Sequence, residues 1–381
     1  MKKSKLHSTF TVALIPFITL LFLNLGCQKN MEKISDQNIS VPSSSSQKSE
    51  KDPQALKNFV QVNLVGDNDE YSPARIDPAL VNGWGVTFSS GGTAWISAEA
   101  TGKSLVVNKD GGQVLAPVSI PSPTSTDGGH PTGIVFSGSA TDFKLPNGNP
   151  ARFIFAGADG VISGWNGGNL AAAIRKVNNA ATAAYLGLAL ANDAGNNFLY
   201  AANFRAGKID VFNSLWAPVN KSFTDPNLPA GYSPFNIQAI DNKLYVMYAK
   251  VGPDGDEIKH PGFGLVDIYN PDGSFVKRFI SNGQLNAPWG IAKTPATFYG
   301  TGSSLQNTYL VGNFGDGHIN AYTWDGEFLG QLRGHGKPIE IEGLWGISFA
   351  PSTATTVNPN RLYFAAGPDE EEHGLFGYLI K

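Results

Sequence analysis

Polar side chains suited to binding a metal ion or a ligand recur in this sequence where short apolar segments end. Four of them carry the carboxylate or amide oxygens that Ca²⁺ and Mg²⁺ prefer, and we predict a divalent metal site from them: Glu99, Asn203, Asn313 and Asp369. A second set lies at corresponding positions and adds an imidazole, an ammonium group and two further carboxylates. We predict that this set contacts a ligand: His130, Asp159, Lys250 and Glu342.

The chemistry open to such a site is ligand binding or hydrolysis. A Ca²⁺ or Mg²⁺ ion held by these oxygens could polarise a carbonyl group or activate water, as in a metal-dependent hydrolase or lactonase. The sequence has no His-Glu-x-x-His, Gly-x-Ser-x-Gly, P-loop or Cys-x-x-Cys motif, so no catalytic residue is identified. The alternative is that the same carboxylates and amides cap strand ends and hydrogen-bond neighbouring blades, since Asp and Asn are favoured in such turns.

The elements that must position these side chains are six repeats. Each begins with a short strand that holds an aromatic–glycine pair or a similar pair, and continues with a second apolar strand and a third strand led by glycine. The pairs are Trp84-Gly85, Thr132-Gly133, Leu186-Gly187, Phe235-Asn236, Trp289-Gly290 and Trp345-Gly346. Repeats of ~40–50 residues with four short strands each are typical of propeller blades. We therefore predict an all-β fold, a six-bladed β-propeller.

The two ends of the chain are expected to close the ring. The sixth repeat runs out after its third strand, residues 375–380, and an unassigned apolar strand lies at residues 59–65. Because an open ring would expose a sheet edge, we expect residues 59–65 to form the outer strand of the sixth blade. The predicted domain is one closed propeller spanning residues 58–381.

This topology should gather the candidate residues on one rim. If the first strand of each blade runs down beside the axis and the second returns, the ends of second strands lie beside the starts of first strands. Six of the candidates follow second strands, while His130 and Glu342 precede first strands. An acidic segment at residues 370–373 falls on the same rim, where a solvated turn is the commoner explanation.

The N-terminus is predicted to direct export. Three lysines precede an uncharged, mostly apolar run at residues 10–23, which is shorter than the ~20 residues of a membrane span. The run ends in Leu25-Gly26-Cys27, which resembles a bacterial lipobox. Residues 1–26 are therefore predicted to be a lipoprotein signal peptide and Cys27 to carry the lipid; the alternative is an ordinary signal peptide with an incidental cysteine. Residues 27–57, poor in large apolar side chains, are predicted to be a disordered tether.

The composition limits the classes of partner. The chain has 28 Lys and Arg against 31 Asp and Glu and no basic stripe, which argues against nucleic acid. Cys27 is the only cysteine, so the chain forms no internal disulfide. We expect instead a membrane contacted through the lipid anchor, an unidentified small molecule or protein as ligand, and a location at the bacterial cell envelope.

Three longer motifs are specific: Leu285-Asn286-Ala287-Pro288-Trp289-Gly290, Val311-Gly312-Asn313-Phe314-Gly315-Asp316-Gly317 and residues 366–374. They closely resemble an uncharacterised bacterial family of six-bladed propellers, some members of which carry an exosortase sorting tail. At fold level the repeats are also similar to NHL-type propellers and the gluconolactonase group. The resemblance implies the fold and no particular activity. The first interpretation is a lipid-anchored binding scaffold at the cell envelope, and the second is a metal-dependent hydrolase.

Overall fold

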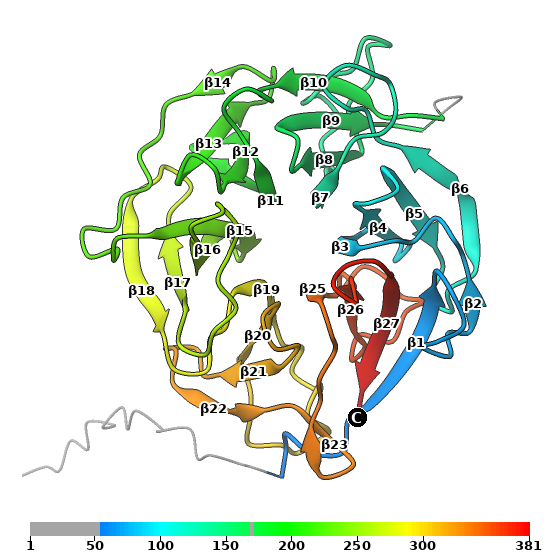
Figure 1. Cartoon of the computed structure of the whole chain (residues 1–381), viewed down its shortest axis with the longest axis vertical. Coiled ribbons are helices and arrows are strands. Elements are labelled where there is room, and N and C mark those ends of the chain that lie inside the picture. Colours follow the sequence, from blue (N-terminus) through cyan, green and yellow to red (C-terminus); the bar gives the residue numbers. More distant parts are fainter. Residues whose placement is uncertain (1–53, 168–170) are drawn as a thin grey trace, which may run out of the picture. The chain divides into compact units, whose positions relative to one another are not determined.

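The computed structural model describes residues 54–167 and 171–381, which form six antiparallel blades around a central axis (Figure 1). This confirms the predicted six-bladed β-propeller. The predicted signal peptide, Cys27 and the predicted tether up to residue 53 lie outside the described residues. Within the described ranges, no helix is long and apolar enough to cross a membrane.

The first three blades are regular four-stranded sheets whose first strand lies nearest the axis. Blade one contains β3 (Gly83–Phe88), β4 (Ala94–Ala98), β5 (Lys103–Val107) and β6 (Gln113–Ser119). Blade two contains β7 (Pro131–Phe136), β8 (Phe153–Gly157), β9 (Val161–Trp165) and β10 (Ile174–Asn178). Blade three contains β11 (Tyr185–Asp193), β12 (Asn196–Asn203), β13 (Lys208–Asn213) and β14 (Pro218–Val219).

The last three blades follow the same plan, with a small hairpin after blade five and a fifth strand in blade six. Blade four contains β15 (Tyr232–Ile240), β16 (Lys243–Lys250), β17 (Gly264–Tyr269) and β18 (Phe275–Ser281). Blade five contains β19 (Pro288–Lys293), β20 (Tyr309–Asn313), β21 (Ile319–Tyr322) and β22 (Phe328–Gln331), and a small hairpin of β23 (Arg333–Gly334) and β24 (Lys337–Pro338) follows it. Blade six contains β25 (Leu344–Phe349), β26 (Leu362–Ala366), β27 (Leu375–Ile380), β1 (Val60–Gly66) and β2 (Arg75–Ile76).

Glycine lets the innermost strands of neighbouring blades approach closely. A Cβ atom built on Gly85 of β3 would lie 2.4 Å from the carbonyl oxygen of Thr132 on β7. No side chain fits at that separation, so the glycine of the repeated pair serves the contact between blades. Blade four has Asn236 at this position, and its Nδ2 donates a hydrogen bond of 2.7 Å to the carbonyl oxygen of Trp289 in blade five.

The ring closes where the two ends of the described chain pair. β1 runs antiparallel to β27, from Val60 opposite Ile380 to Gly66 opposite Leu375. The strand order of the sixth blade is β2-β1-β27-β26-β25, so the N-terminal strand lies outside β27. This confirms the expected closure and covers the outer edge of β27 with backbone hydrogen bonds.

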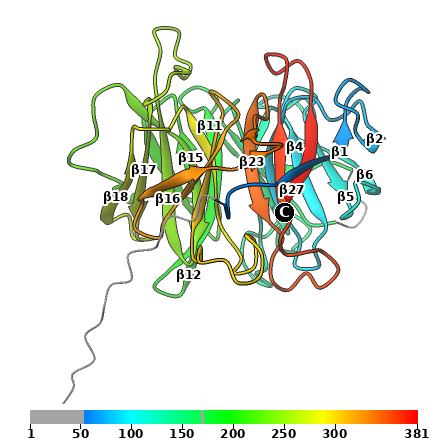
Figure 2. The same cartoon turned by 90° about the horizontal axis from the view of Figure 1, so that it is seen from below.

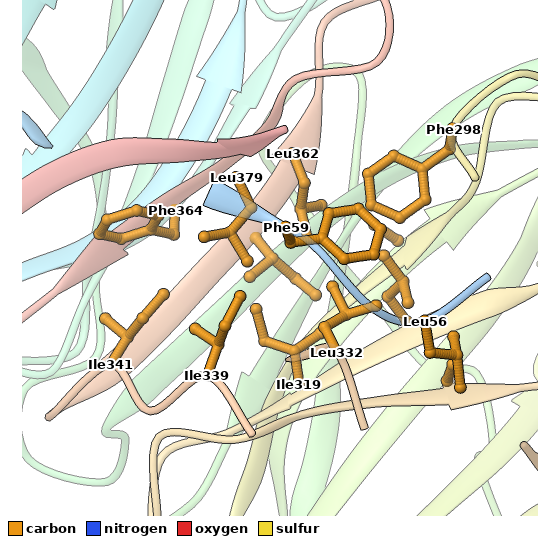
Figure 3. Packing of buried hydrophobic residues seen from close by; sticks show 14 of the residues in the cluster. Leu56, Phe59, Phe298, Ile319, Leu332, Ile339, Ile341, Leu362, Phe364 and Leu379 are labelled. Carbon is orange, nitrogen blue, oxygen red and sulfur yellow. The ribbon is translucent and has the colours of Figure 1, made fainter. Parts of the chain in front are cut away.

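An apolar seam, formed by residues 55–59 and the side chains they contact, packs the N-terminal segment against blades five and six (Figure 3). Phe59 is 1% exposed, and its ring stacks on Phe298 with ring centroids 5.0 Å apart. Ala55 and Leu56 are also buried in this cluster, although the domain was expected to begin at residue 58. The folded part therefore includes the end of the segment predicted to be tether.

Phe59→Ala should destabilise the closed ring strongly. Truncating a fully buried phenylalanine costs ~3–5 kcal/mol of the free energy of unfolding. Val60→Ala, at the next residue, is the matched control: Val60 is 49% exposed, so its truncation should cost less than ~0.5 kcal/mol. Unfolding in guanidinium chloride measures both variants. Equal unfolding midpoints would contradict a stabilising role for the seam.

Candidate ligand-binding site at the axial mouth

One face of the ring carries the loops that follow second strands and precede first strands. Antiparallel pairing places the start of β3 beside the end of β4, and the start of β7 beside the end of β8. Figure 2 shows the loop between β26 and β27, in red, rising on one face of the ring. Seven polar residues of these loops form what we call the axial mouth: Asn82, Glu99, His130, Asp159, Glu257, Lys259 and Glu371.

Asn82 joins blade one to blade six. Its Nδ2 donates hydrogen bonds to Glu99 Oε2 at 3.1 Å and to Glu371 Oε2 at 2.8 Å. Its Oδ1 accepts a hydrogen bond from Trp345 Nε1 at 3.1 Å. Asn82 is 3% exposed and has a φ of 50°, a left-handed conformation that asparagine tolerates better than most residues. This amide therefore holds two carboxylates from different blades in fixed positions.

Glu99 also pairs with a histidine of the neighbouring blade. Glu99 Oε1 lies 2.7 Å from His130 Nδ1, and the carboxylate is largely shielded from solvent. This hydrogen bond raises the pKa of His130, and the negative charge of Asp159 raises it further. Glu99, His130 and Asp159 are thus the predicted site residues that the structure brings together.

Asp159 contributes an unused hydrogen-bond acceptor. Its Oδ1 accepts from the backbone nitrogen of Val161 at 3.3 Å, while its Oδ2 is buried without a hydrogen-bond partner among the described residues. Burial raises the pKa of this carboxyl group. A buried acceptor without a partner loses its hydration without compensation, so a ligand that donates a hydrogen bond here would gain affinity.

A second carboxylate pair lies across blades four and six. Burial raises the pKa of Glu257 to about 7, the negative charges of Glu371 and Asp256 add to this effect, and Lys259 opposes it. Burial likewise raises the pKa of Glu371. The charge of Glu371 therefore acts on Glu257 although the two residues belong to different blades.

Aromatic rings fill the axis next to this polar network. Trp345 stacks on Trp84 and on Phe314, with ring centroids 3.5 Å and 3.7 Å apart, and Trp289 meets Trp345 edge-on at 6.0 Å. Trp289 also lines a cavity of about 230 Å³ enclosed by the innermost strands of the blades. The aromatic cluster gives the axial mouth a rigid apolar floor.

The two predicted asparagine ligands are engaged inside their own blades. Asn203 is 1% exposed; its Oδ1 accepts from the backbone nitrogens of Ala184 and Ala206, both at 3.2 Å. Asn313 Nδ2 donates to the Gln284 carbonyl oxygen at 2.7 Å. The contacts of Asn203 match the capping alternative, whereas Asn313 Oδ1 is buried without a hydrogen-bond partner among the described residues.

The remaining predicted residues lie farther out on the rim. The Asp369 side chain is 68% exposed and 3.8 Å from His373, and Glu342 Oε1 accepts from the Asp369 backbone nitrogen at 3.2 Å. Lys250 places its ammonium group 4.1 Å from the centre of the Phe263 ring. In residues 54–167 and 171–381, no group of three or more His, Cys, Asp or Glu side chains is arranged to hold a metal ion.

No role in the site was predicted from the sequence for Asn82, Glu257, Lys259 and Glu371. Asn82 precedes a first strand and Glu371 belongs to the acidic segment at residues 370–373, so the repeat pattern places both on the rim. Glu257 lies in a second acidic segment, residues 254–257, for which a solvated loop is likewise the commoner explanation. The directions of the Glu257 and Glu371 side chains depend on the loops at residues 251–263 and 367–374, which follow no repeat.

Fold and site together define a six-bladed propeller with a polar, aromatic-floored site on one axial face. No protein-family model matches the sequence. The chain is 32% identical over 337 residues to uncharacterized protein L690 of Acanthamoeba polyphaga mimivirus. The matched region covers 84% of this chain and 86% of that protein. Uncharacterized protein R648 of the same virus is 32% identical over 338 residues, covering 84% and 80%.

The chain belongs to the family of these two viral proteins. The sequence motifs resemble a bacterial family, whereas these two relatives are viral proteins that are named as uncharacterized. The structure of this chain is similar to that of the α-L-arabinofuranosidase Arb93A from Fusarium graminearum, with a TM-score of 0.53 and 12% sequence identity. The match covers 85% of this chain and 98% of that one. At this identity the likeness concerns the fold alone.

Glu257→Gln should change the pH dependence of stability. Because the pKa of Glu257 rises from 4.5 to about 7 on folding, its favourable contribution is complete below pH 4.5 and is lost as the pH rises through 7. The variant should match the wild type near pH 4.5 and gain ~1–2 kcal/mol at pH 8. Denaturant unfolding at both pH values measures this, with the exposed Glu372→Gln as control. A gain that is equal at both pH values would contradict the burial of this charge.

Proposed function

We propose that this protein is an exported, lipid-anchored propeller that binds a polar ligand at its axial mouth. The observation that carries the proposal is the convergence of Asn82, Glu99, His130 and Glu371 from three blades, next to the unpartnered carboxylate oxygen of Asp159. Hydrogen bonds between neighbouring blades also fit the structural alternative, and the buried Asp159 Oδ2, which has no partner among the described residues, is what favours a ligand. Such a preorganised polar network is typical of binding sites.

The surroundings of the mouth favour a ligand of small-molecule size. A cavity of about 740 Å³ opens beside it between blades three and four, and its lining includes Ala158, Phe204, Tyr232 and Asp256. Volumes of ~300–1,000 Å³ are usual for ligand pockets. The lining combines apolar side chains with Arg205 and the carboxylates of Asp254 and Asp256, so a ligand could lie partly in this cavity while its polar groups reach Asp159.

A hydrolase is the second candidate, and the pKa of Glu257 favours it. A carboxyl group that titrates near 7 can donate and accept a proton at neutral pH. Glu371, whose pKa is also raised, could serve as its partner. The metal-dependent form of this candidate has weaker support, because Asn203 Oδ1 already accepts two backbone hydrogen bonds and no group of three or more His, Cys, Asp or Glu side chains gathers among the described residues.

The binding proposal is tested with a panel of neutral sugars, amino acids, nucleosides and amines, by thermal shift and by monitoring breakdown of each compound. At least one compound should raise the melting temperature of the wild type, and Glu99→Gln should remove most of that shift because the network loses its central charge. Asp241→Asn is the control: Asp241 is an exposed acid paired with Lys293 in the β15–β16 turn, on the opposite rim. No shift from any compound, or the same shift in Glu99→Gln, would refute binding at the mouth; breakdown of the bound compound would establish the hydrolase.

The export proposal rests on the basic start, the apolar run and Cys27. Cys27→Ala should move the protein from the membrane fraction to the soluble fraction of a bacterial host, because the thiol that would accept the lipid is lost. Fractionation and mass analysis of the mature N-terminus measure this. A soluble, unmodified wild-type protein would contradict the anchor and leave the binding proposal intact.

A further inference from the structure

The geometry points to an organic ammonium group as the part of the ligand that the axial mouth recognises, with the side chain of Lys259 occupying its place in the free protein. This inference rests on the proposed function and specifies its ligand. Lys259 would act as a tethered competitor that an incoming cation displaces from an aromatic face.

The first observation is an ammonium group already seated on the aromatic floor. Lys259, on the loop after β16, places its Nζ 4.1 Å from the centre of the Phe314 ring. Phe314 is 2% exposed and stacks on Trp345, so the ring is fixed. Cations are attracted to such ring faces, which is how proteins recognise choline-like groups.

The second observation is the charge around that position. Glu257, Glu371 and Glu99 come from blades four, six and one, and the charge of Glu99 raises the pKa of Glu371. The positive charge of Lys259 lowers the pKa of both Glu257 and Glu371. The mouth therefore favours a cation, and removing Lys259 would leave these carboxylates to repel one another.

The third observation is that Lys259 is held loosely. Among the described residues its ammonium group forms neither a hydrogen bond nor a salt bridge, and the residue as a whole is exposed. The base of its loop is fixed independently, because the backbone nitrogen of Ile258 donates to the Lys250 carbonyl oxygen at 2.8 Å. Displacement thus requires only a rotation of one long side chain. A neutral or anionic ligand would not replace the positive charge that the mouth loses when the Lys259 ammonium group moves away.

Titration calorimetry with choline and n-butylammonium tests this, with 3,3-dimethylbutan-1-ol as the neutral analogue of choline. Both cations should bind the wild type, and the alcohol should not. Lys259→Ala should tighten binding of the cations about two- to fivefold by removing the competitor. Glu371→Gln should weaken it about tenfold by removing a charge-assisted contact. Lys277→Ala is the matched control: its Nζ lies 5.4 Å from the Phe279 ring on the outer strand of blade four, and it should bind like the wild type.

Equal binding of choline and its neutral analogue would overturn the inference, as would weaker or unchanged binding in Lys259→Ala. The two proposals fail separately. If a sugar or nucleoside binds at the mouth with dependence on Glu99 while both cations do not, the ammonium inference is wrong and the proposed function stands. If no compound of the panel and neither cation binds, both are wrong.

Discussion

Pairing between β1 and β27 is the interaction on which the rest of the ring depends, because each blade packs only on its two neighbours and an unclosed ring would expose a sheet edge. Hydrogen bonds also link the closing strand to the axial mouth. Asp67, which directly follows β1, accepts hydrogen bonds from the backbone nitrogen of Gly374 at 3.0 Å and lies 2.8 Å from His373 Nδ1. The His373 carbonyl oxygen in turn accepts from the backbone nitrogen of Asn82. The strand that closes the ring therefore positions the loop that carries Glu371.

The inner strands and the aromatic floor make this site rigid. The glycines of the repeated pair allow blades to touch backbone to backbone, and the stacked rings of Trp84, Trp345 and Phe314 fill the axis. The side chains of the mouth thus project from inner strands and stacked rings whose positions are fixed. Such a frame suits selection by charge and shape, since a ligand must match groups that are already in place.

The negative charge of the mouth comes from several blades. Its carboxylates lie on blades one, two, four and six; Asn82 bridges Glu99 and Glu371, and His130 pairs with Glu99. A small divalent ion needs six or more oxygens within about 2.5 Å, whereas a larger organic cation can contact separated carboxylates and a ring face together. The two viral relatives belong to the same family as this chain, and their names assign no ligand.

The sequence by itself determined the blade number, the closure by residues 59–65 and the rim on which polar groups gather, because these follow from strand periodicity, aromatic–glycine pairs and antiparallel alternation. It also placed Glu99, His130 and Asp159 on that rim, where the structure brings the three side chains together. Tertiary structure decided the rest. Asn203 and Asn313 occupy equivalent strand ends but turn into their own blades, while Glu257 and Lys259 enter the mouth from an irregular loop. Side-chain direction in such loops depends on contacts with residues distant in the chain, and no repeat pattern encodes those contacts.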